Sequence, residues 1–143
     1  MKLPIATLLL AITSAAAAEI PLDLAGLPRQ PALLVAHGKT IACTGVPLAV
    51  LLARAGVPAG EALRGPALAS VVIATGKDGY RAVFSLAEID AKLGNRPVFV
   101  VDRCAGAPLT AVDGPLRLVV PGEVRAARSV RQLVALRVAA VPE

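Results

Sequence analysis

The sequence predicts an α+β fold of mixed, short-stranded sheets with two or three short helices. Short apolar and β-branched runs recur along the chain, separated by Gly and Pro breakers, which is typical of strands joined by tight turns. Few stretches show the apolar spacing or capping residues of a helix. Neither an internal repeat nor a Gly-rich phosphate loop is present, so the sequence does not predict a nucleotide-binding βαβ series.

Length and composition indicate a single domain behind an export segment. The chain has 143 residues, 56% hydrophobic and 2% aromatic, so its core must consist mainly of small aliphatic side chains. Residues 1–18 combine a positive start, a short apolar run and an alanine-rich end, the pattern of a cleaved signal peptide. We therefore expect residues 19–143 to form one soluble periplasmic domain with no membrane span after cleavage.

In the first half, we expect strands at residues 20–24 and 32–36, followed by a turn at His37-Gly38-Lys39. The clearest helix begins at Pro47, which suits the first turn because proline has no N–H to leave unpaired. An apolar stripe of leucines follows at helical spacing, and Gly56 ends the helix. Residues 58–65 form a connector that can hold one helical turn.

In the second half, we expect residues 68–75 and 80–84 to form a β-hairpin around the turn Gly76-Lys77-Asp78-Gly79. Ser85 and Glu88 form a capping box, which begins a short helix. The remaining expected strands are residues 98–103, 116–120 and 130–138. Asp78, Asp102 and Asp113 are predicted to be turn residues and ion-pair partners.

The net charge of +5 indicates anionic partners. Nucleic acid is not expected, because the arginines are scattered and no aromatic side chains are interleaved for base stacking. Gly114-Pro115 and Pro121-Gly122 instead bracket a short apolar strand, and arginines follow the second breaker. Arginine presents a rigid fork to oxyanions, so we predict an anion-binding patch beside Pro121-Gly122 formed by Arg128 and Arg131, helped by Arg103 or Arg117. The alternative is a solvated basic face.

Several motifs in the correct order resemble the sulfite-oxidase-type molybdopterin-binding domain family, and the resemblance spans roughly the whole mature chain. They are Gly45-Val46-Pro47-Leu48 with the following leucines, Asp78-Gly79-Tyr80, the stretch from Gly114 to Gly122, and Ser129-Val130-Arg131. The resemblance implies a mixed α/β domain around a pyranopterin molybdenum cofactor that carries out oxygen-atom or electron transfer. It resembles in particular the small standalone exported members.

In catalytic members a cysteine thiolate ligates the metal, and its position corresponds here to residues 33–37, which contain no cysteine. We therefore expect an oxidoreductase-like domain that carries no tightly bound, cysteine-ligated molybdenum, and whether it is an enzyme stays open. The alternative is a non-catalytic periplasmic binding or partner module for an anionic ligand. On either interpretation molybdopterin, through its pterin phosphate, is a candidate ligand, and a periplasmic protein is a candidate partner. The expected cofactor-binding residues are His37, Arg103, Arg117, Arg128 and Arg131, with no catalytic residue nominated and no metal ligand.

Cys43 and Cys104 are the only cysteines, and two interpretations stay open. They form a disulfide, as expected in an oxidising compartment, or Cys43 is a buried small hydrophobe and Cys104 a turn thiol. A molybdenum thiolate at Cys43 is a third and weaker alternative. His37 is the sole histidine, and it is either a ligand-facing donor or, the favoured interpretation, a structural hydrogen-bonding group in a turn.

Overall fold

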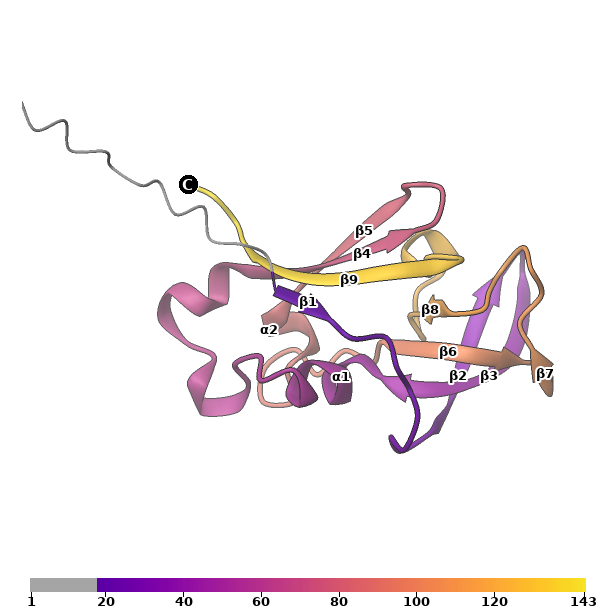
Figure 1. The fold of residues 1–143 in the computed structure, drawn as a ribbon, viewed down its shortest axis with the longest axis horizontal. Coiled ribbons are helices and arrows are strands. Elements are labelled where there is room, and N and C mark those ends of the chain that lie inside the picture. The colour runs from indigo at the N-terminus through magenta and orange to yellow at the C-terminus, as the bar shows by residue number, and fades with distance from the viewer. Residues whose placement is uncertain (1–17) are drawn as a thin grey trace, which may run out of the picture.

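Two antiparallel sheets make up the computed structural model, which describes residues 18–143 (Figure 1). The first, here called the β9 sheet, has four strands in the order β1 (Ala18–Ile20), β9 (Leu133–Ala140), β4 (Ser70–Gly76) and β5 (Arg81–Ser85). The second, the β6 sheet, has five: β2 (Gln30–Ala36), β3 (Lys39–Pro47), β6 (Phe99–Cys104) and β7 (Ala107–Pro108), with β8 (Arg117–Val119) also paired to β6. The predicted signal peptide, apart from Ala18, lies outside the described residues.

Local hairpins and long-range pairings both contribute to these sheets. β2 pairs with β3 and β4 with β5 as hairpins, as the turn residues between them predict. β9, in contrast, lies between β1 and β4, which are distant in sequence, and so closes the β9 sheet from the opposite end of the chain. The predicted α+β fold with short strands is confirmed, although local hairpins account for only part of it.

Both predicted helices are present (Figure 1), and residues of both line one small pocket. α1 (Leu48–Arg54) begins directly after Pro47, buries three leucines, and is followed by Gly56 with φ 75°, a backbone conformation that favours glycine. α2 (Leu86–Ile89) carries the predicted capping box: Glu88 N–H donates to Ser85 Oγ, and Ser85 N–H donates to Glu88 Oε1. Three short 3₁₀ turns complete the helical elements: η1 (Gly60–Ala62), η2 (Gly65–Ala69) and η3 (Ala126–Arg128).

The first strand differs from the prediction, because it ends at Ile20 instead of continuing to Leu24. Ile20 pairs with Leu136 of β9, and the chain then turns away from the sheet. The turn is stabilised by hydrogen bonds from Ala25 N–H to Asp23 Oδ1 and from Leu27 N–H to the Leu24 carbonyl oxygen. β9 itself continues to Leu133, but Pro21 follows Ile20 and has no N–H to donate to the ladder, so pairing stops although the alternation of apolar and polar residues continues.

Two apolar clusters form the core. The larger draws on the β9 sheet, both helices and the inner ends of β3, β6 and β8. The smaller lies within the β6 sheet and contains Cys43 with Phe99, Val101 and Val119. Here a disulfide joins Cys43 to Cys104 at directly paired positions of β3 and β6, so both thiols are used and the free-thiol alternative is wrong.

A close approach between β3 and β6 depends on Gly45. A Cβ at this position would overlap the Val100 carbonyl oxygen, so no larger residue fits without moving the strands apart. The register also shifts between Thr44 and Gly45, which separates the disulfide-bearing part of β3 from the part that leads into α1. Among residues 18–143, no helix is long and apolar enough to cross a membrane.

Candidate anion-binding site

A cavity of about 630 Å³ lies where turns from the two sheets meet the segment that follows β8. The β2–β3 turn contributes His37 and Gly38, and the β4–β5 turn contributes Asp78 and Tyr80. Residues 124–127 form a further wall, and the lining is completed by Ala36, Arg117, Ser129, Val130 and Arg131. Three arginines therefore face one cavity, with Arg125 as the third.

Arg117 is the buried cation of this cavity. It lies in β8 opposite Val101, and only 5% of its surface is exposed. Its Nη1 donates to Asp113 Oδ1 at 3.3 Å, but its Nε is fully buried and has no hydrogen-bond partner within residues 18–143. A buried donor without a partner costs roughly 1–3 kcal/mol, so such groups in proteins need an explanation.

Asp113 is shared between two arginines. Its Oδ1 lies 3.3 Å from Arg117 Nη1 and 3.2 Å from Arg131 Nε. Burial lowers the pKa of Arg117; Asp113 opposes this effect and the neighbouring Arg131 adds to it. One carboxylate thus partly neutralises two guanidinium groups, and the cavity keeps an excess of positive charge.

The two turns that line the cavity adopt strained or glycine-dependent conformations. His37 has φ 51° and Gly38 φ 73°, so the β2–β3 turn lies in the left-handed region at both central residues. In the β4–β5 turn, Asp78 Oδ1 accepts a hydrogen bond from Tyr80 N–H at 3.0 Å, and Gly79 has φ 85°. The sequence prediction of turns at both places is confirmed, and both turn tips contribute side chains to the cavity.

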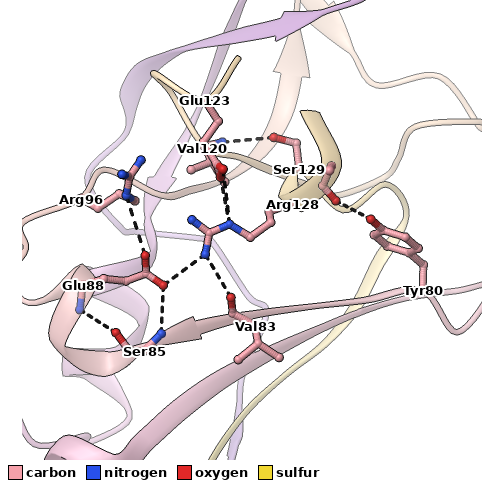
Figure 2. A network of polar contacts seen from close by, with 10 residues as sticks. Tyr80, Val83, Ser85, Glu88, Arg96, Val120, Glu123, Arg128 and Ser129 are labelled. Carbon is pink, nitrogen blue, oxygen red and sulfur yellow. Dashed lines mark hydrogen bonds and ion pairs between the residues drawn. The ribbon is translucent and has the colours of Figure 1, made fainter. Parts of the chain in front are cut away.

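Arg128 was predicted to bind an anion, but in the structure its guanidinium forms ion pairs within the protein. Figure 2 shows its guanidinium between the carboxylates of Glu123 and Glu88. Nε donates to Glu123 Oε1 at 3.0 Å, and Nη1 donates to Glu88 Oε1 at 3.2 Å and to the Val83 carbonyl oxygen at 3.1 Å. The guanidinium carbon also lies 4.4 Å from the Phe84 ring centroid, a cation–π contact. Burial opposes the charged form, but the hydrogen bonds with Glu88 and Glu123 outweigh it and raise the pKa of Arg128.

These contacts hold η3 and the 124–127 wall against the β9 sheet. Tyr80 Oη donates to the Ala127 carbonyl oxygen at 2.6 Å, seen at the right of Figure 2. At the base of the segment, Val120 N–H donates to the buried Ser129 Oγ at 3.2 Å. The wall is therefore fixed from both ends, and Arg128 positions it without lining the cavity.

The structure brings together three of the five residues expected to bind a cofactor: His37, Arg117 and Arg131. Arg103 and Arg128 do not line this cavity. The exposed Arg103 donates from Nη2 to the Gly106 carbonyl oxygen in its own turn, and Arg128 is held by Glu88 and Glu123. The arginines of the predicted patch beside Pro121-Gly122 therefore do not form one cluster: Arg117 and Arg131 line the cavity, whereas Arg128 and Arg103 lie elsewhere. Ligand binding by any of them stays a prediction.

Sequence reasoning missed Tyr80 and Val124 as cavity residues. The sequence indicated Tyr80 only as part of the Asp78-Gly79-Tyr80 motif. It gave no role to Val124, which lies between the charged residues Glu123 and Arg125. A local signal did exist for Val124, because an apolar residue flanked by two charged residues beside a Pro-Gly corner is expected to be exposed, and the structure leaves it 89% exposed. The ion-pair role predicted for Asp113 and Asp102 is confirmed, since Asp102 pairs with Arg29.

A family model for the oxidoreductase molybdopterin binding domain matches residues 30–143. The chain belongs to this family. The match covers every strand except β1, together with all the helical elements and all the cavity residues. A search of curated proteins found no match.

Members of the oxidoreductase molybdopterin binding domain family typically bind the molybdopterin cofactor. The cavity of this member fits one part of that group, its anionic phosphate, because Arg117 and Arg131 offer cationic donors. It does not offer the sulfur ligand, because Cys43 and Cys104 are joined to each other. No cluster of three or more His, Cys, Asp or Glu side chains within residues 18–143 is placed to hold a metal instead.

Proposed function

We propose that this chain is an exported binding domain of the molybdopterin-binding family that holds a small anionic ligand in the Arg117 cavity, without a cysteine–molybdenum bond. One observation carries the proposal. Arg117 is buried at the cavity with a donor that no group within residues 18–143 satisfies. An anion in the cavity would offset the burial of the charge, and it would accept that hydrogen bond once the atoms that cover Nε move aside.

The positions of the surrounding charges support the same conclusion. Arg131 contacts the same Asp113 oxygen as Arg117, and Arg125 adds a third guanidinium to the lining. Arg117 is the buried member of the pair, and it shares its carboxylate with the half-exposed Arg131, so its charge is only partly compensated, which is costly for a buried group. Here two arginines share a single carboxylate.

Molybdopterin is one ligand that this proposal covers. Arg117 and Arg131 would bind its phosphate, and His37 lines the same cavity. When bound in catalytic members, the cofactor supplies oxygen-atom or electron transfer. In this chain the Cys43–Cys104 disulfide leaves no thiolate for its metal, so ligand binding without cysteine-ligated molybdenum is the expected state.

Export to the periplasm is part of the proposal. The disulfide is typical of proteins in oxidising compartments, and residues 1–18 have the pattern of a signal peptide. Expression of the whole chain in a bacterial host should yield periplasmic protein whose intact mass begins at Glu19. Protein that retains residues 1–18 would contradict this part.

Anion binding is tested by isothermal titration of the periplasmic protein with sulfate, phosphate, pyrophosphate and benzoate. At least one anion should bind, and Arg117→Met should weaken that binding by about tenfold or more, because a charged hydrogen bond contributes about 1.5–3 kcal/mol. Arg103→Met is the matched control, since this arginine is exposed and lies outside the cavity. If Arg117→Met does not fold, Arg131→Met replaces it, because half of that side chain is exposed.

The proposal fails if no anion of the panel binds, or if both arginine variants bind as well as the parent. The metal is tested separately, by elemental analysis after expression in a host that makes the cofactor. The expected content is far below one molybdenum per chain. Near-stoichiometric molybdenum that is lost in a Cys43→Ser variant would show that Cys43 ligates the metal.

A further inference from the structure

The proposed function, on which this inference rests, names only a small anion as the ligand. The residues that line the cavity indicate which class of anion it binds. The first indication is the free edge of Arg117. Its Nη1 is used by Asp113, whereas Nε and Nη2 make no hydrogen bond within residues 18–143. The Nε–Nη2 edge of a guanidinium presents two parallel N–H donors that match two oxygens of one carboxylate or other oxyanion.

The second indication is the charge of the site. Arg117, Arg125 and Arg131 line the cavity, and Asp78 and the shared Asp113 supply two negative charges against them. Counted over these three arginines and two aspartates, the formal charge is +1. One excess charge compensates a monoanion, whereas a dianion would leave a negative charge beside the carboxylates of Asp78 and Asp113.

The third indication is the apolar part of the lining. Ala36, Ala126, Ala127 and Val130 contribute apolar surface, and Val124, which is 89% exposed, also lines the cavity. A volume of about 630 Å³ also greatly exceeds what a bare oxyanion fills. An apolar wall beside a cationic edge suits a ligand with an organic body attached to its charged group.

We infer that the cavity binds an organic monoanion whose carboxylate lies side-on against Arg117 and whose apolar or aromatic body covers Val124 and the 126–127 wall. Asp113 sets the charge class, because it cancels one of the arginine charges. Among the ligands that the proposed function covers, the inference therefore ranks the phosphate of molybdopterin, which is mainly a dianion, below an organic carboxylate. Arg128 and Tyr80 contribute by holding the wall in place.

Isothermal titration at pH 7.5 and low salt compares two probe series on the periplasmic protein. Acetate, hexanoate and benzoate share a carboxylate and differ in apolar body, whereas sulfate, phosphate and pyrophosphate carry more charge and no body. Benzoate and hexanoate should bind at least about tenfold tighter than acetate, from apolar burial, and also tighter than the inorganic anions.

Two variants test the separate parts of the inference. Val124→Asn should weaken benzoate binding about fivefold, the value of one lost apolar contact, and leave acetate binding unchanged. Val112→Asn is the matched control, because Val112 is also exposed, at 67%, but does not line the cavity. Asp113→Asn should move the preference toward sulfate by about tenfold, because the cavity gains one positive charge.

The outcomes separate this inference from the proposed function. If sulfate or pyrophosphate binds tightest to the parent, the cavity is an anion site but its assignment to organic monoanions is wrong. Equal binding of acetate and benzoate, or equal losses in Val124→Asn and Val112→Asn, overturns the role of the apolar wall. Absence of binding by every probe overturns the proposed function itself.

Discussion

Removing the Cys43–Cys104 disulfide should strongly lower the free energy of unfolding, and the structure allows the size of the loss to be worked out. The two cysteines are separated by 61 positions in sequence. For a loop of that length, the chain-entropy model gives a stabilisation of about 4 kcal/mol. With a urea m-value of about 2 kcal/mol per molar, the unfolding midpoint should fall by about 2 M.

The measurement compares three samples by urea unfolding: the parent, the parent in reductant, and the Cys43→Ala, Cys104→Ala double variant. The reduced parent keeps both sulfur atoms, so its loss reports the cross-link alone. Cys43 is 1% exposed and contacts the smaller apolar cluster, so the double variant should lose about 1 kcal/mol more from the cavity left behind. Reductant should have no effect on the double variant, which makes it the control for non-specific effects.

The same reduction should weaken anion binding. Ala36 and Ala126 line the cavity and also contact the apolar cluster that contains Cys43, so loosening that cluster disturbs one side of the cavity. The reasoning is refuted if a thiol assay finds both cysteines reduced while the urea midpoint moves by less than about 0.5 M. In that case the loop between the cysteines is already restricted in the unfolded chain.

Two further predictions concern charged side chains away from the disulfide. Arg128→Met should lower the free energy of unfolding by about 2 kcal/mol, because it removes partly exposed ion pairs and a cation–π contact. Glu123→Gln should lower it by less. Equal urea midpoints for Arg128→Met and the parent would contradict the role of Arg128 in holding the 124–127 wall. Asp90 accepts N–H bonds from Gly60 and Lys92, in that order of effect, which lowers its pKa. Its contribution is therefore present above the unfolded-state pKa of about 4 and is lost as the pH falls through the lower folded-state pKa. The midpoint difference between parent and Asp90→Asn should shrink from pH 7 to pH 2.5, and a constant difference would exclude ionisation of Asp90 as its source.

Local chemistry explains why parts of the fold were predictable. The capping box of Ser85 and Glu88 needs only four consecutive residues, and the structure forms it as expected. The helix between Pro47 and Gly56 is likewise set by its own ends and its leucine stripe. Hairpin turns followed from glycine and aspartate at the turn positions. Each of these features depends on neighbours in sequence.

The site was harder to predict because its partners are distant. Arg128 and Arg131 lie three positions apart, yet Arg128 is drawn to Glu88, forty positions away, whereas Arg131 reaches Asp113. Sequence spacing cannot predict which carboxylate each arginine contacts, since this depends on how β5 and α2 approach η3 in the folded chain. The early end of the first strand has a local cause: β9 continues to Leu133, but Pro21 directly after Ile20 has no N–H to extend the ladder.

The turns at His37-Gly38 and Asp78-Gly79 have a consequence for how this scaffold can diversify. Both belong to hairpins whose strands are fixed by backbone pairing, but the tips themselves are exposed and carry side chains into the cavity. Loop tips tolerate substitution and insertion far better than strands do. Longer or chemically different turn tips would therefore change the lining of the cavity while leaving both sheets, the disulfide and Arg117 intact. The selectivity of relatives can thus change through a few turn residues, which makes these two tips the natural positions for library-based redesign.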